Sequence, residues 1–155
     1  MKKYLIIAVL SIFALTACNR GKIYEKRQEF DNYTWNRFKP LFFEVPIKDR
    51  EKEYNVYLTL RHITQYPYDD LKVNLTIYSP SGEERTTMHT FLIKDKGGKF
   101  LGSGTGDLWD LKLLVKGKFY FNEVGTYKFQ IDNLMDYYDI VGLVDLGVLV
   151  ERANK

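Results

Sequence analysis

Apolar and polar residues alternate along several stretches of this chain, and a period of two is typical of strands with one buried face. Segment 54–61 is the clearest case, because every second residue from Tyr54 to Leu60 is apolar. Helical periodicity is weak throughout the part that follows residue 22. The predicted strands are 23–30, 42–47, 54–61, 73–78, 86–93, 111–116, 127–131 and 144–151.

Turn residues separate these strands. Segment 79–82 has the sequence Ser-Pro-Ser-Gly, with proline at the second position and glycine at the fourth, which favours a type I turn. It predicts an antiparallel hairpin between 73–78 and 85–92. Short strands joined by turns predict an all-β fold, an antiparallel two-sheet β-sandwich of seven or eight strands.

A glycine-rich segment, 97–106, raises the question of a phosphate-binding loop. A P-loop needs Ser or Thr after its lysine, but Phe100 follows Lys99. A dinucleotide loop needs a third glycine where this chain has Asp107. We therefore expect a long connection between the two sheets, with positive φ at some of the glycines.

Length and composition narrow the function classes. The 155 residues suffice for one domain, and 24 of them are aromatic. The net charge is only +3, with 23 basic residues interspersed among 20 acidic ones, so we expect no nucleic-acid partner. One cysteine and two histidines, Cys18, His62 and His89, exclude a disulfide framework and a closed zinc site. We predict no catalytic residue, no metal site, no cofactor and no small-molecule ligand.

The N-terminus has the form of a signal peptide. Two lysines precede the almost wholly apolar segment 4–15, which is too short to span a membrane. Residues 15–18, Leu-Thr-Ala-Cys, resemble the bacterial lipobox, and Cys18 is the chain's one cysteine. We predict removal of 1–17, acylation of Cys18 with fatty chains such as palmitate, a short tether at 18–22 and a single β-sandwich domain at 23–152. Two or three acyl chains hold a protein stably on a membrane.

One loop is a candidate for partner contact. Arg61 lies on the polar face of a predicted strand, shortly before Tyr66, Pro67 and Tyr68. Its five donors suit the loop carbonyls or the carboxylates of the following Asp69 and Asp70. We expect an ordered turn, with Pro67 as a candidate cis residue, that serves as a recognition surface. The alternative is a corner that only connects two strands.

Several short motifs occur in a characteristic order and spacing along about 120 residues. They are Cys18, Trp35, Phe43-Glu44-Val45, Tyr54, Leu60-Arg61, Tyr66-Pro67-Tyr68, Leu71, Pro80-Ser81-Gly82, Leu101-Gly102, Gly104, Gly125-Thr126-Tyr127, Val141-Gly142, Asp145-Leu146-Gly147 and Glu151. Together they resemble the GldH family of gliding-motility lipoproteins from Bacteroidetes. Three positions depart from the family pattern, at His62-Ile63, near Phe100 and at Asp136.

The resemblance implies a non-enzymatic, lipid-anchored accessory of the gliding machinery and its linked type IX secretion system. Its expected partners are other envelope proteins of that machinery. Residues 19–22 lack the acidic cluster that resembles a surface-export signal in Bacteroidetes, which favours the outer membrane with the domain facing the periplasm.

A glycan-binding β-sandwich lipoprotein is the main alternative, and an envelope hydrolase is a further one. An exposed aromatic platform beside carboxylates would favour a glycan. An exposed apolar patch without a cleft would favour a protein partner.

Overall fold

The computed structural model describes residues 21–153, and strands dominate them. Eight strands have seven or more residues, which confirms the predicted all-β class. Three strands of three residues each were not predicted, because such short segments show no alternation. The strands are β1 (Lys22–Glu29), β2 (Thr34–Asn36), β3 (Leu41–Ile47), β4 (Tyr54–Ile63), β5 (Asp70–Tyr78), β6 (Glu84–Leu92), β7 (Ser103–Thr105), β8 (Leu108–Phe119), β9 (Gly125–Asn133), β10 (Asp139–Val141) and β11 (Leu143–Arg152), with a 3₁₀ turn, η2, at Asp31–Tyr33.

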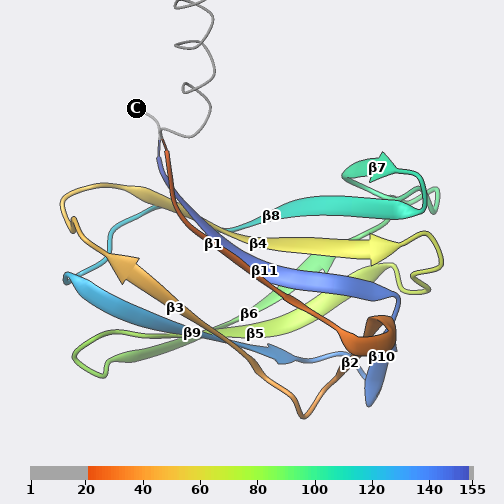
Figure 1. Ribbon diagram of the computed structural model, residues 1–155, viewed down its shortest axis with the longest axis horizontal. Helices are drawn as coiled ribbons and strands as arrows, with labels where there is room; N and C mark the ends of the chain where they lie inside the picture. Colours follow the sequence, from red (N-terminus) through yellow and green to blue (C-terminus); the bar gives the residue numbers. More distant parts are fainter. Residues whose placement is uncertain (1–20, 154–155) are drawn as a thin grey trace, which may run out of the picture.

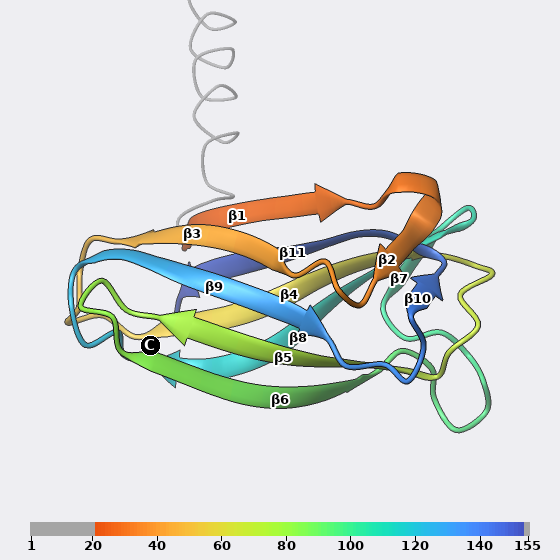
Figure 2. The same cartoon turned by 90° about the horizontal axis from the view of Figure 1, so that it is seen from below.

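Two antiparallel sheets pack face to face. The five-stranded sheet has the order β1-β11-β4-β8-β7, and the four-stranded sheet has the order β3-β9-β5-β6. Figure 1 shows the two layers, and Figure 2 looks onto the four-stranded sheet with the other sheet behind it. The predicted sandwich is therefore confirmed. Among the described residues, no helix has the length and apolar character needed to cross a membrane.

The hairpin predicted around Gly82 is confirmed. Strands β5 and β6 pair in register from Asp70–Leu92 to Tyr78–Glu84. The N–H of Gly82 donates to the carbonyl oxygen of Ser79 at 3.0 Å, as a type I turn requires. Gly82 has φ of +92°, a conformation that a side chain disfavours.

The core lies between the inner faces of the sheets. On β4, Tyr54, Val56, Leu58 and Leu60 are all buried, as the alternation predicts. Burying one such aliphatic side chain contributes about 1.5–3 kcal/mol. Phe121 closes one end of the core, with ring centroids 5.5 Å from Tyr54 and 4.7 Å from Tyr127.

The glycine-rich segment connects the sheets, as predicted. It runs from β6 in the four-stranded sheet to β8 in the five-stranded sheet, and includes β7. Gly98, Gly102 and Gly106 have positive φ. Gly102 is also closely packed, since a Cβ there would lie 2.2 Å from the carbonyl oxygen of Asp110.

The two ends of the sandwich differ. The N-terminal end carries Gly21, Lys22 and Arg152, whose N–H donates to the Gly21 carbonyl oxygen at 2.7 Å. Strand β1 runs eight residues from there, about 26 Å, to the opposite end. We call that opposite end the tip, formed by segments 30–40, 64–69 and 134–142. Figure 1 shows the start of β1 and the β2–β10 ribbon on opposite sides of the molecule.

The β2–β10 ribbon closes the tip. It pairs Thr34 with Val141 and Asn36 with Asp139. Trp35 of β2 is buried, and its ring stacks on Phe30 with centroids 5.5 Å apart. The indole nitrogen of Trp35 donates to the carbonyl oxygen of Lys39 at 2.8 Å, which satisfies the one polar atom of this buried ring.

Candidate functional site

Cys18, the predicted lipidation site, lies outside the described residues and stays a prediction. Lys22, the first residue of β1, is the fourth residue after Cys18 in the sequence. An extended chain of that length spans at most about 14 Å. A lipid on Cys18 would therefore hold the N-terminal end of the sandwich close to the membrane.

Arg61 does not bind the loop that follows it, which corrects our expectation. Its Nε donates to Oδ1 of Asp110 at 2.9 Å, and its Nη2 donates to Oδ2 at 3.0 Å. Arg61 on β4 and Asp110 on β8 are direct partners in the sheet register. The two-pronged pair therefore joins neighbouring strands on the outer face of the five-stranded sheet.

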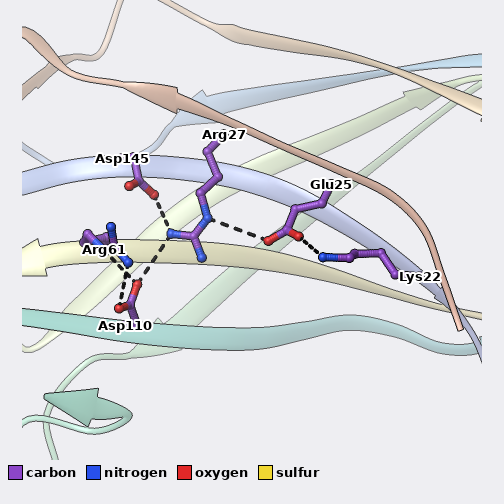
Figure 3. A network of polar contacts seen from close by, with 6 residues as sticks. All are labelled: Lys22, Glu25, Arg27, Arg61, Asp110 and Asp145. Atoms are coloured by element: carbon purple, nitrogen blue, oxygen red, sulfur yellow. Dashed lines mark hydrogen bonds and ion pairs between the residues drawn. The ribbon is translucent and has the colours of Figure 1, made fainter. Parts of the chain in front are cut away.

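Arg27 extends this pair into a network (Figure 3). Its Nη1 lies 2.8 Å from Oδ1 of Asp145 and 3.5 Å from Oδ1 of Asp110. The Asp145 side chain is only 6% exposed. Gly147 lies opposite Arg27 in the register of β1 and β11, and its missing side chain leaves the space that Arg27 occupies. The network thus links β1, β11, β4 and β8.

The charges of this network balance one another. Burial alone would raise the pKa of Asp110, but hydrogen bonds and charge from Arg61, then from Arg27, outweigh burial and lower it. Hydrogen bonding to Asp110 in turn raises the pKa of Arg61. Two arginines thus face two aspartates. The arrangement stabilises the sheet and keeps the Asp110 carboxyl charged near neutral pH.

The loop at Tyr66, Pro67 and Tyr68 is an ordered corner. Tyr66 is 1% exposed, and its hydroxyl donates to the Asp70 carbonyl oxygen at 3.1 Å. Burial, and then the neighbouring Tyr68 and Asp70, raise its pKa. Pro67 is exposed and trans, since no cis peptide bond occurs between residues 21 and 153. The loop therefore presents Pro67 and part of Tyr68 to solvent, and not Tyr66.

His62 lies beneath this loop as a buried residue of β4. Its ring centroid is 5.1 Å from that of Tyr66 and 4.7 Å from that of Phe100. Nδ1 lies 2.9 Å from the carbonyl oxygen of Ile63, and Nε2 has no hydrogen-bond partner among the described residues. Burial lowers the pKa of His62, so the ring is neutral at pH 7. It packs as a core side chain of the sheet.

Exposed aromatic rings gather at the tip, and the sequence interpretation missed them. Phe38 is 71% exposed, Tyr138 69% and Tyr137 56%. Phe38 and Tyr138 have ring centroids 5.7 Å apart, and Tyr137 packs 5.1 Å from Tyr68. Large aromatic side chains with this exposure are typical of protein contact surfaces. The Tyr137-Tyr138 pair, which lies outside any alternating segment, is the signal that points to them.

Metal ligands do not cluster in the part of the chain that the structure describes. Residues 21–153 contain no group of three His, Cys, Asp or Glu side chains with the geometry to hold an ion. The polar network and the aromatic tip are two features of the described surface that bring side chains from several strands together.

An all-β domain that follows a lipobox-like sequence is typical of small bacterial envelope lipoproteins. The family model described as GldH lipoprotein matches residues 22–150, and the chain belongs to this family of gliding-motility lipoproteins.

Two relatives match along nearly their whole length. A gliding motility lipoprotein GldH homolog from Christiangramia forsetii is 24% identical over 156 residues, covering 96% of this chain and 95% of the relative. The gliding motility lipoprotein GldH of Flavobacterium johnsoniae is 24% identical over 155 residues, covering 96% of each chain. The resemblance noted from the motifs is therefore confirmed.

Among solved structures, TmCBM61 in complex with β-1,4-galactotriose is similar with a TM-score of 0.33 and 12% identity, covering 89% of this chain and 97% of that one. CBM35 from Cellvibrio japonicus Abf62 has a TM-score of 0.32, 12% identity, and coverage of 89% and 94%. Likenesses of this size carry no argument about a ligand.

Proposed function

We propose that this protein is a lipid-anchored accessory of the gliding-motility and type IX secretion machinery that works by binding other envelope proteins. The lipid is on Cys18, and the domain stands on the outer membrane and faces the periplasm. Membership of the GldH family supports the link to gliding. The observation that carries the binding role is the opposition of the two ends. The tether enters at one end of the sandwich, and the exposed aromatic rings lie at the other.

The short tether explains why the tip is the surface available to a partner. Up to about 14 Å of chain keeps the N-terminal end near the lipid headgroups. Strand β1 alone is about 26 Å long, so the tip can reach well into the periplasm. Phe38 and Tyr138 are then free to contact a protein there.

Binding rather than catalysis agrees with the state of the charged side chains. Arg27, Arg61, Asp110 and Asp145 pair with one another, and Nε2 of the buried His62 has no hydrogen-bond partner among residues 21–153. The tip meets one criterion of a glycan site, because its exposed rings lie beside carboxylates and a groove. The geometry of the rings nevertheless favours protein contact over sugar stacking. The rings of Phe38 and Tyr138 are tilted by 36° to each other, and do not form one flat platform.

A Cys18→Ala variant in the native host tests the proposal. We expect the variant to lose its acyl mass and leave the membrane fraction. We also expect it to fail to restore gliding or type IX secretion in a strain that lacks the gene. A variant that is released from the membrane and still restores both would contradict the need for an anchored accessory. A wild-type protein without an acylated Cys18 would contradict the anchor itself.

A further inference from the structure

A groove of about 400 Å³ lies at the tip, between the end of β1 and the β2–β10 ribbon. The side chains of Trp35 and Leu41, both buried in the core, form part of its lining. Phe30 and a set of polar side chains from both sides form the remainder. They include Gln28, Glu29, Asp31, Asn36, Lys39 and Asp139.

The groove carries an excess of negative charge. Glu29, Asp31 and Asp139 are exposed carboxylates, and Lys39 is the one cation of the lining. None of these three carboxylates forms an ion pair with a lysine or arginine of the described chain. Asp139 accepts a hydrogen bond from Asn36 Nδ2 at 2.8 Å. The groove is therefore complementary to a positive side chain.

The exposed aromatic pair continues this groove. Tyr138 precedes Asp139 in the chain, and the N–H of Phe38 donates to Oδ1 of Asn36 at 3.0 Å. An apolar shelf next to an acidic cleft matches a ligand that has an apolar side chain beside a positive one. Such a pattern of an apolar centre and a charged rim is typical of protein interfaces.

We propose that the groove and the Phe38–Tyr138 pair bind an extended segment of another envelope protein, in which Lys or Arg lies beside an aromatic or aliphatic residue. This inference rests on the proposed function, because it identifies the chemistry of the partner. The acidic lining disfavours the anionic headgroups of a membrane.

A second copy of the chain does not fit this role in one membrane. A symmetric tip-to-tip pair would place the two N-terminal ends at opposite extremes of the dimer. With tethers of at most about 14 Å, the two lipids could not enter the same leaflet. The geometry therefore points to a different protein.

Photo-crosslinking with p-benzoylphenylalanine, placed at Phe38 of the full lipoprotein in native cells, tests the inference. Tyr120 is the control position, because it is 51% exposed and follows β8 at the N-terminal end. We expect position 38, and not position 120, to crosslink to a segment of another protein that carries Lys or Arg next to an apolar residue. Sequencing of the crosslinked peptide identifies that segment.

Charge-neutral variants of the groove provide the second arm. We expect Glu29→Gln with Asp31→Asn to lower the crosslink yield from position 38 at least fivefold. Glu51→Gln with Glu84→Gln, two exposed carboxylates at the N-terminal end, should leave it unchanged. Equal thermal unfolding of all variants shows that the fold is retained.

Several results would overturn the inference. The first is a crosslink from position 38 to lipid, to polysaccharide, to a second copy of the chain or to a segment without Lys or Arg. The second is the absence of any crosslink from position 38. The third is a crosslink yield that the groove variants do not change. If gliding or secretion proteins still copurify with the lipoprotein in that case, the proposed function stands and only the groove assignment fails. If none copurifies, the proposed function fails as well.

Discussion

The side chain of Arg27 lies over Gly147 and reaches Asp145, with 2.8 Å between Nη1 and Oδ1. This contact gives a physical role to the Asp145-Leu146-Gly147 motif that marks the family resemblance. Asp145 supplies the charge that holds Arg27, Leu146 is buried in the core, and Gly147 leaves space for the arginine. The motif therefore binds the edge strand β1, which follows the tether, to the centre of its sheet.

Gly147→Ala should destabilise the fold by about 1–3 kcal/mol, the usual cost of overpacking. The added Cβ would lie 2.4 Å from the backbone oxygen of Lys26 and 2.7 Å from the Arg27 side chain. Gly117→Ala is the matched control, because its Cβ would meet other atoms no closer than 3.6 Å. Urea unfolding of both variants checks this. If Gly147→Ala is as stable as wild type, β1 can move away from the added Cβ at no cost, and the close contact with Gly147 does not stabilise the fold.

Asp110 should make folding sensitive to acid. Its folded pKa is lowered, so its stabilising effect is present above the unfolded value of about 3.9 and is lost as the pH falls through the folded pKa. We expect Asp110→Asn to flatten the pH dependence of the unfolding free energy below about pH 4. Asp136→Asn is the control, because Asp136 is exposed and has no ion pair to a described residue. This variant should keep the pH dependence of the wild type. If the unfolding free energies of wild type and Asp110→Asn change with pH in parallel, the Arg61–Asp110 pair does not have this role.

His62 should also make the folded state less stable as the pH falls, but in a higher pH range than Asp110. Burial lowers its folded pKa, so the unfolded chain binds the proton more readily. Stability is therefore complete above about pH 6.5 and falls by up to about 1.4 kcal/mol per pH unit below it. His62→Phe keeps an aromatic ring and should weaken this dependence, while His89, whose pKa burial also lowers, accounts for the remainder. Unfolding at pH 7.5 and 5.5 measures it, and an unchanged slope in His62→Phe would contradict the assignment.

Tyr66 and Tyr137 should differ sharply in how much each contributes to the stability of the fold. Tyr66→Ala removes a fully buried ring and should cost about 3 kcal/mol of unfolding free energy. Tyr137→Ala alters a side chain that is 56% exposed, and should change stability by less than about 0.5 kcal/mol. Thermal and urea unfolding of the two variants provide the comparison. A Tyr66→Ala protein as stable as wild type would mean that the corner is not part of the core.

The long strands could be predicted from the sequence because each has one buried face. The alternation at 54–61 and the turn at 79–82 reflect local chemistry, which a single stretch of residues reveals. Strands β2 and β10 have three residues each, so the same signal is absent. Their pairing depends on contacts between segments about one hundred residues apart.

Side-chain partners were harder to predict than strands. Asp110 lies 49 residues after Arg61, and the two meet because β4 and β8 pair in a register that includes two irregularities. The Tyr66 ring packs against those of His62 and Tyr68, and Gly142 approaches its backbone so closely that a Cβ would lie 2.9 Å from the Tyr66 Cα. Neither relation is visible in the local sequence. The exposed Phe38 was missed for the same reason, since its neighbour Tyr138 belongs to a distant loop.

Crosslinking and purification of the lipoprotein from native membranes tests the central claim most directly. Wild type, Cys18→Ala and Phe38→Ala with Tyr138→Ala are compared for the proteins and polysaccharides that they retain. Our account predicts that wild type recovers gliding or type IX secretion components. The tip variant should be acylated, folded and membrane-bound but lose those components, and Cys18→Ala should leave the membrane. Enrichment of polysaccharide without these proteins, or full recovery by the tip variant, would contradict it.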